Sequence, residues 1–387
     1  MAARLRTSSS DARRQGAASL IGVLAAMLLV LHAHYSLQAV MPSYLFVWLF
    51  LFGLSLGSMA LLFVHNLTGG VWGDLVRPVL QALVRMLPYC ALLAIPLLLR
   101  QRDLYLWMEP NEGGLSNLRP GQEWYLNVPF FYVRWFAYFG IWITLGVLLG
   151  KPSARRSSDA TAAPAARSQL VSALGLLLYL LTTTFASFDW TMALTPQWYS
   201  TEFGLLTAIG QCLSALAFAV VAVAMSKSAG SEILRPGFHD LGNLLLALVL
   251  FWAYLAFMQF LIMWIEDLPR DISWYLPRAE EGWRGLSLFL VCLHFALPFL
   301  LLLSRRLKRA PMLLGGLAAV LLLGGLADTF WLVIPAFRPQ HFELRWTDLL
   351  TFVALSGVWS GLFLRALSAS NAGPLLAPAV EPAIRHA

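Results

Sequence analysis

Ionisable side chains lie within or beside the long apolar segments of this 387-residue chain, where they could carry protons or hold each other in ion pairs. Asp189 and Asp328 lie near the ends of two such segments, and His239 and Asp240 lie at the beginning of another. Charge inside a bilayer is costly, so each residue needs an ionic partner, a water-filled cavity or a shifted pKa. Arg134 is expected to pair with Asp189 or Asp328, because the three should lie at similar depth. The residue types therefore fit either structural ion pairs or a proton route.

The stretch 238–283 combines most of these features. Its apolar part, 244–265, spans roughly 33 Å as a helix, which is enough to cross a bilayer. At about 100° per residue its polar side chains fall into two seams. The first seam holds Asp240, Asn243 and Tyr254, and the second holds Trp252, Gln259 and Glu266. Lipid cannot satisfy polar groups, so both seams should face protein or trapped water. They fit either packed neighbours or a path for protons or quinone.

Polar residues are expected in two layers, one reached from each side of the membrane, with a mostly apolar barrier between them. Such layers would suit two half-channels for protons. The candidate residues for this route are Asp189, His239, Asp240, Tyr254, Gln259, Glu266 and Asp328. If the chain instead binds quinol, the head group is expected near His65, Arg134 or Asp189. No residue is assigned a catalytic or metal-binding role.

Composition sets the class of protein. Hydrophobic residues make up 59% of the chain and charged residues 12%, and the mean hydropathy is +0.70. This predicts an all-α polytopic membrane protein with about ten transmembrane helices. The three cysteines lie singly in apolar segments, without C-x-x-C or C-x-x-C-H spacing, so no local motif binds haem or an iron–sulfur cluster. His294 lacks an obvious partner, which disfavours a bis-histidine haem.

Ten apolar segments are long enough to span a bilayer. They are 17–34, 43–65, 79–99, 128–149, 169–188, 204–226, 241–265, 285–304, 311–334 and 347–367. The first resembles a signal peptide but is interpreted as an anchor. The predicted organisation is a tail at 1–16, four helices in 17–149, a disordered linker at 150–168, six helices in 169–367 and a disordered tail at 368–387.

Charged residues predict the topology. With the N-terminus in the cytoplasm, the inner segments hold 17 of the 27 Lys and Arg, and the outer segments hold 8. The positive-inside rule is then obeyed, with both termini, the linker and the tails cytoplasmic. The net charge of +7 therefore reflects topology signals and not nucleic-acid binding. The outer loops are rich in Trp and Tyr, which fits either docking of an external partner or an interfacial belt.

Several motifs resemble one known family. The runs Phe238–Gly242, Trp252–Phe257 and Gln259–Ile262 are similar to the ActF-like membrane subunits of alternative complex III, a bacterial quinol:cytochrome c oxidoreductase. Further similar runs follow in order over roughly residues 50–365, and they are Leu67–Gly73, Tyr125–Phe131, Thr184–Trp190, Asp328–Trp331 and Trp346–Asp348. Two departures are Met258, where Ser is expected, and Arg270, where the family tends to place an acid.

The resemblance implies an NrfD-like (NrfD/PsrC-like) fold with two four-helix bundles plus peripheral helices, in a bacterial plasma membrane. It implies assembly with multihaem and monohaem cytochromes c, an iron–sulfur protein and a sister NrfD-like subunit. Haem c and iron–sulfur clusters would then lie in the partners, and quinol oxidation in the sister subunit. This chain would bind no cofactor and would be a scaffold with a proton route. The candidates at matching positions are Asp189, His239, Asp240, Tyr254 and Asp328.

Three functions therefore remain open. The first is a respiratory-complex subunit that scaffolds the redox partners, is not catalytic alone, and provides a proton route. The second is a quinol-binding catalytic anchor of an NrfD-type oxidoreductase. The third is a secondary transporter, which the lack of paired Gly/Pro-interrupted spans disfavours.

Overall fold

The computed structural model describes residues 16, 22, 24–27, 37–108, 118, 120–150, 162–226, 235–280 and 282–370. Within this part of the chain the regular elements are helices, and no strand occurs. Nine of these described helices are long and apolar enough to cross a membrane. The predicted all-α polytopic membrane class is thereby confirmed.

The nine spans agree with nine of the ten predicted segments. They are Val40–Thr68, Val71–Leu99, Val128–Leu149, Ser168–Leu194, Phe203–Ala224, Arg235–Glu266, Trp283–Leu302, Pro311–Ala336 and Trp346–Ser368. Most of the predicted first segment, 17–34, lies outside the described residues. The same holds for the predicted tail at 1–16, for 151–161 of the predicted linker and for 371–387 of the predicted C-terminal tail.

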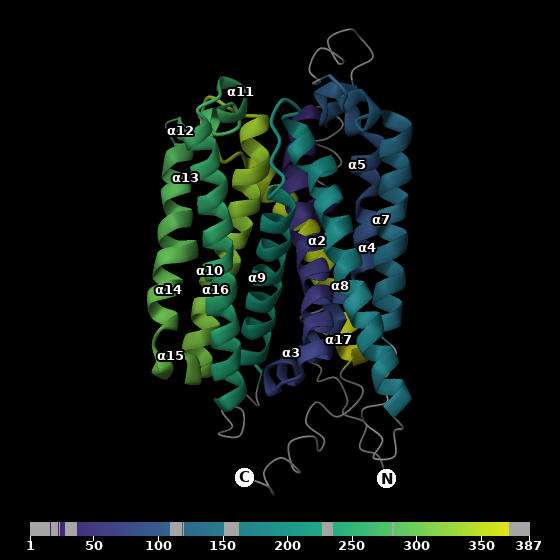
Figure 1. Ribbon diagram of the computed structural model, residues 1–387, viewed down its shortest axis with the longest axis vertical. Helices are drawn as coiled ribbons and strands as arrows, with labels where there is room; N and C mark the ends of the chain where they lie inside the picture. Colours follow the sequence, from purple (N-terminus) through teal and green to yellow (C-terminus); the bar gives the residue numbers. More distant parts are fainter. Residues whose placement is uncertain are drawn as a thin grey trace, which may run out of the picture.

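The first four described spans pack together (purple to teal in Figure 1). They consist of α2 Leu37–Thr68, the broken helix α3 Val71–Val84, α4 Leu87–Leu93 and α5 Ile95–Leu99, then α7 Val128–Leu149 and α8 Ala162–Trp190. Pro96 lies at the start of α5, where its missing N–H contributes to the break. Asn127 caps α7 by accepting a hydrogen bond from the backbone N–H of Phe130, which satisfies one of the free donors at that helix end.

The next four spans form a second group (green in Figure 1). They are α9 Phe203–Ala224, α10 Arg235–Glu266, the sequence α13 Trp283–Phe289, η7 Leu290–Ala296 and α14 Leu297–Leu302, and α16 Pro311–Val333. The short helices α11 Pro269–Ile272 and α12 Leu276–Ala279 lie at one end, and α15 Arg305–Arg309 lies at the other. From the predicted topology we call the end with α11 and α12 outer, and the end with α15 inner.

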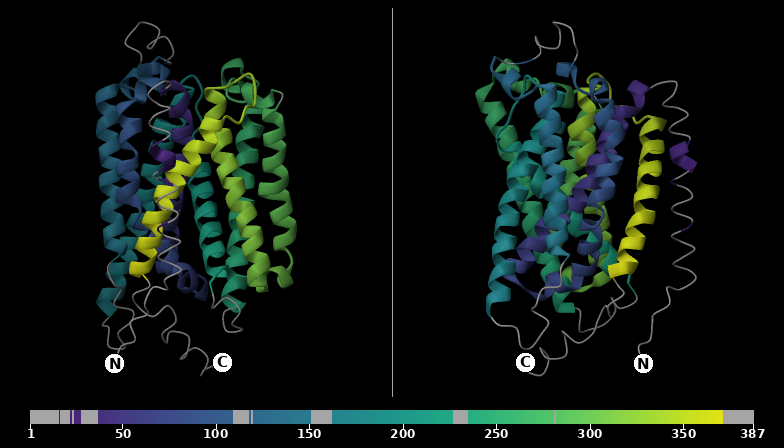
Figure 2. Two further views of the ribbon diagram at one scale, coloured as in Figure 1. Left: turned by 180° about the vertical axis from the view of Figure 1, so that it is seen from behind. Right: turned by 90° about the vertical axis from the view of Figure 1, so that its right-hand side faces the viewer.

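Helix α2 is the centre of the fold. It contacts α3, α8, α9, α16 and α17 Trp346–Ser370. In its most apolar 18-residue stretch, 89% is buried inside the protein. Gly57 permits close contact with α9, because a Cβ atom there would lie 2.2 Å from the carbonyl oxygen of Gln211. Helix α17 runs obliquely across α2 and α3 (Figure 2). The two groups therefore meet along α2, α9 and α16, and the candidate site lies there.

Candidate functional site

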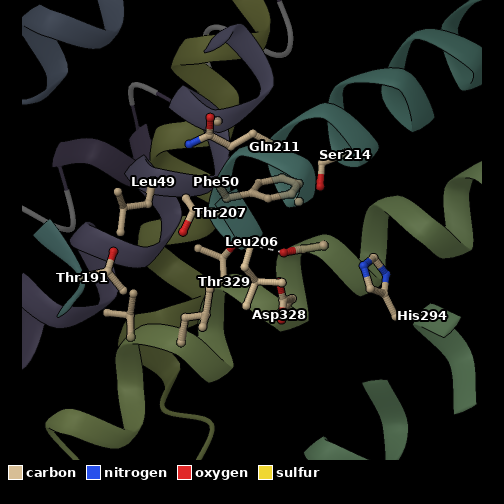
Figure 3. Close-up of a pocket in the computed structure, with 15 residues that line it drawn as sticks. Leu49, Phe50, Thr191, Leu206, Thr207, Gln211, Ser214, His294, Asp328 and Thr329 are labelled. Carbon is tan, nitrogen blue, oxygen red and sulfur yellow. Dashed lines mark hydrogen bonds between the residues drawn. The ribbon is translucent and has the colours of Figure 1, made fainter. Parts of the chain in front are cut away.

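A cavity with a mixed polar and apolar lining lies where α2, α9, η7 and α16 meet, within the membrane-spanning part of the fold (Figure 3). Its volume is about 60 Å³, and one water molecule needs roughly 10–15 Å³ of such space. The cavity therefore has room for a few water molecules. Its polar lining comes from both helix groups, and the residues are Thr191, Thr207, Gln211, Ser214, His294, Asp328 and Thr329.

Asp328 is the one carboxylic acid in this lining. It projects from α16 into the cavity, and it forms no ion pair within the described chain. The indole of Trp252 on α10 lies on the same side of the cavity, because a Cβ atom on Gly210 would lie 3.8 Å from Cδ1 of Trp252, while Nε1 of Trp252 has no hydrogen-bond partner in the described chain. Gly210 on α9 leaves this side of the cavity open, since a Cβ atom there would lie 3.9 Å from Oδ2 of Asp328. The carboxyl group is thus exposed to the cavity and lacks a compensating cation.

His294 forms another part of the wall. It is 1% exposed and lies in the π-helix Leu290–Ala296, a local irregularity that is frequent at functional sites. Its ring meets Trp252 edge to face, with centroids 4.6 Å apart. Its Nδ1 has no hydrogen-bond partner in the described chain. Trp252 therefore contacts His294 and lies near Gly210, on the same side of the cavity as Asp328.

Sequence reasoning did not include His294 among the proton-route candidates, because a lone histidine on an apolar helix is usually part of the packing. A local signal was present. Pro298, four residues later, has no N–H to offer the carbonyl of His294, which disturbs the regular α-helical pattern at this position.

Asp189 has a different environment from that of Asp328. Arg134 binds both of its carboxylate oxygens, with Nε to Oδ2 at 2.9 Å and Nη2 to Oδ1 at 2.7 Å. The hydroxyl group of Tyr138 donates to Oδ2 at 2.8 Å, and Nη1 of Arg134 donates to the carbonyl oxygen of Tyr125 at 2.9 Å. The predicted pair between Arg134 and Asp189 is confirmed. Thr191, two residues beyond Asp189, lines the cavity, so the ion pair and the cavity are neighbours.

The two polar seams of α10 point in different directions. Trp252 and Gln259 of the second seam are buried, and Nε2 of Gln259 lies 3.2 Å from the hydroxyl of Tyr275. Glu266 of this seam is exposed at the helix end. In the first seam Asp240 is exposed and Tyr254 is 55% exposed. The expectation that protein or trapped water satisfies both seams therefore holds for the buried part of the second seam. In the first seam it holds for Asn243, whose Oδ1 accepts a hydrogen bond from Nζ of Lys308 at 2.7 Å, whereas Asp240 and Tyr254 remain uncovered by the described chain.

The inner end holds two further histidines. His239 on α10 is partly buried, and its Nδ1 lacks a hydrogen-bond partner in the described chain. Nη2 of Arg77 donates to Nδ1 of His65 at 2.8 Å, and Nε2 of His65 lies 3.0 Å from the carbonyl oxygen of Gly70. Since the guanidinium can only donate, Nδ1 accepts and Nε2 carries the proton of a neutral ring. His65 thus holds the turn between α2 and α3. Arg134, another candidate for the quinol site, lies towards the outer end of α7, so the two are at opposite ends of the fold.

Two buried arginines at the outer end were not anticipated as fold-stabilising groups. Arg338 binds both oxygens of Asp348, at 2.7 and 3.0 Å, and Ser43 on α2 donates to the same carboxylate. This contact fixes the start of α17. Arg278 donates instead to three backbone carbonyls, those of Trp274, Trp331 and Leu332. Burial lowers the pKa of Arg278 to about 9, which leaves it charged at neutral pH.

The described residues contain no group of three or more His, Cys, Asp or Glu side chains that could hold a metal ion. No protein-family model matches the chain, and neither does any curated protein with which it was compared. A functional assignment therefore depends on the geometry of the cavity and on the resemblance described above.

Proposed function

We propose that the chain is an integral membrane subunit of a respiratory quinol:cytochrome c oxidoreductase of the alternative complex III type. In this role it holds the redox subunits at the bacterial plasma membrane, with both termini in the cytoplasm, and conducts protons through the cavity of Asp328. The ordered sequence resemblance supports the type of complex. The observation that carries the proton route is a carboxyl group without an ion-pair partner, facing a water-sized cavity between two helix groups.

The chemistry of such a carboxyl group suits proton transfer. An uncompensated carboxylate is costly inside a membrane, and binding a proton removes that charge. Water molecules in the cavity would bring the proton to Asp328 and take it away, and the hydroxyl of Ser214 could hold one of them in place. The imidazole of His294 offers a second proton-binding group in the same wall.

The roles of the two acids separate on this basis. Asp189 accepts hydrogen bonds from Arg134 and Tyr138, so its negative charge is compensated in place. Protonating it would remove a buried ion pair, which is energetically unfavourable. We therefore assign Asp189 to the stability of the outer end and Asp328 to the proton route.

The size of the cavity argues against the quinol-binding alternative at this position. Pockets for organic ligands typically measure 300–1,000 Å³, whereas this cavity has about 60 Å³. The residues expected around a quinol head group, His65 at the inner end and Arg134 with Asp189 at the outer end, are also engaged in hydrogen bonds within the chain. The geometry thus favours water and protons as the occupants.

The test is the substitution Asp328→Asn in the intact complex, reconstituted into vesicles. We expect quinol:cytochrome c turnover without a proton gradient to persist, while the number of protons moved per electron falls. Asp267→Asn, an exposed position beyond α10, is the matched control and should change neither quantity. Unchanged proton stoichiometry in Asp328→Asn would contradict the proton route, and purification without haem-containing subunits would contradict the complex.

A further inference from the structure

The outward side of α10 combines polar and apolar side chains in a way that lipid alone does not suit. Only 28% of the most apolar 18-residue stretch of this helix is buried inside the protein. Exposed residues recur at helical spacing along one side, which we call the α10 face, and they are Asp240, Asn243, Ala247, Leu250, Tyr254 and Phe257. Of these, Asn243 already accepts a hydrogen bond from Nζ of Lys308. Residues three or four apart share a side of a helix, so these six form one stripe.

Tyr254 is the central feature of the α10 face. It lies 12 residues before the end of α10 at Glu266, roughly 18 Å along the axis, in the middle of the apolar part of the span. Its side chain is 55% exposed, and its hydroxyl group has no hydrogen-bond partner in the described chain. Hydrocarbon offers no acceptor at this depth, whereas hydroxyl groups between membrane helices form hydrogen bonds across the interface.

We propose that the α10 face binds a transmembrane helix of a different subunit. That helix would place a hydrogen-bond acceptor opposite Tyr254 and a lysine or arginine opposite Asp240. Asp240 lies near the inner end, is exposed and has no ion-pair partner in the described chain. A basic residue at the inner end of a membrane helix is the arrangement that the positive-inside rule favours. Ala247, two turns inward from Tyr254, allows the two helices to approach closely.

Two other occupants fit the charges and the geometry less well. A second copy of this chain, related by a twofold axis along the membrane normal, would bring two Asp240 carboxylates to the same depth at one interface, and like charges repel. The described residue Gly22, near the N-terminus, lies elsewhere, because it packs directly against the backbone of Gly357 and Val358 in α17.

Helix α8 provides an internal comparison. Its outward side carries the exposed leucines Leu170, Leu174, Leu177 and Leu181. Such a surface is satisfied by lipid chains and needs no protein partner. The contrast between Tyr254 on α10 and Leu177 on α8 therefore supplies both the test position and its control.

The experiment replaces Tyr254 with a benzophenone-bearing amino acid in the full chain, in its native membrane, and identifies the photo-adducts by mass spectrometry. We expect an adduct with one polypeptide that has a basic residue at the inner end of a transmembrane helix. The same probe at position 177 should yield lipid adducts. Adding Asp240→Lys should reduce the protein adduct at position 254 several-fold. An adduct between two copies of this chain, lipid adducts alone at position 254, or no effect of Asp240→Lys would overturn the inference.

A second measurement needs no crosslinking amino acid. Tyr254→Phe keeps the ring and removes the hydroxyl group, so it should lower the yield of the same partner in detergent purification, whereas Leu177→Phe should not. Equal yields of the partner from both variants would count against the α10 face.

The inference rests on that part of the proposed function which places the chain in a complex, and not on the proton route. The two can fail separately. A crosslinked partner outside any redox complex would preserve the α10 face and contradict the proposed function. Lipid adducts alone, with normal co-purification of haem-containing subunits, would contradict the α10 face as a partner site and leave the proposed function intact.

Discussion

Arg134 and Asp189 form a two-point ion pair, with the guanidinium Nε and Nη2 each bound to a different carboxylate oxygen at 2.9 and 2.7 Å. The planar guanidinium matches the carboxylate in this geometry, which Lys cannot reproduce. Asp328, on α16 in the second helix group, has no such partner in the described chain. The two acids thus differ in chemistry because only Asp189 meets a cation in the described chain.

Removing the cation of this pair should destabilise the protein strongly. Arg134→Ala leaves the carboxylate of Asp189 buried and uncompensated, which costs about 3–5 kcal/mol in such pairs. We expect a clear drop in the midpoint of thermal unfolding in detergent. Arg100→Ala, which removes a half-exposed partner of Asp103, should have little effect. If Arg134→Ala unfolds like the wild type, the pair does not stabilise the fold.

A double variant separates the loss of the pair from the exposure of a lone charge. Arg134→Met combined with Asp189→Leu removes both charges and retains apolar volume. Its stability should exceed that of Arg134→Ala, because no uncompensated charge remains. The same thermal unfolding measurement checks this order.

The contact between His294 and α16 should be sensitive to a single methyl group. A Cβ atom on Gly324 would lie 2.1 Å from Nδ1 of His294, so Gly324→Ala must displace the ring. We expect a loss of about 1–3 kcal/mol in the free energy of unfolding, as for overpacked cores. Gly316→Ala on the same helix meets open space and should be neutral or stabilising. Combining Gly324→Ala with His294→Ala should recover part of the loss, and full additivity would argue against direct contact.

Arg278 should stabilise the outer end through the shape of its side chain as well as its charge. It binds the carbonyls of Trp331 and Leu332 at the end of α16, and its guanidinium lies 3.5 Å from the ring centroid of Trp274. Arg278→Lys keeps the charge, but it loses the planar guanidinium that binds several carbonyls at once and stacks on the ring of Trp274. We therefore expect Arg278→Lys to lose most of the thermal stability that Arg278→Ala loses. Limited proteolysis of the loop before α13 gives a second readout, and a wild-type cleavage pattern in Arg278→Lys would refute this role.

His65 should affect stability rather than quinol affinity. Its two ring nitrogens are occupied by Arg77 and by the carbonyl of Gly70. His65→Ala removes both contacts, and each hydrogen bond contributes about 0.5–1.5 kcal/mol. We expect a lower unfolding temperature with an unchanged KM for quinol in the assembled complex. A raised KM at unchanged stability would instead support the quinol-binding alternative.

Hydrophobicity and charge were sufficient to predict the membrane class and nine of the spans within the described chain, because a bilayer demands long apolar helices. Depth alone also suggested that Arg134 could meet Asp189. The cavity could not be predicted in this way. It depends on which helices are neighbours, and on Gly210 leaving space beside Asp328.

Other contacts have no signature in the sequence. Arg278 binds backbone carbonyls, which every residue carries, so no complementary side chain reveals the site. Helical periodicity placed Tyr254 and Gln259 on different sides of α10, but it could not decide which side faces the protein. The structure shows that Gln259 is buried and Tyr254 is exposed.

The burial of α2 has a consequence for biogenesis. Its neighbours α9, α16 and α17 are synthesised long after it, with α16 beginning at Pro311. During translation the surface that these helices later cover must be shielded by lipid, by the insertion machinery or by early non-native contacts. Chains interrupted before α9 should therefore be recognised by membrane quality control, even though each helix they contain is able to span the bilayer alone.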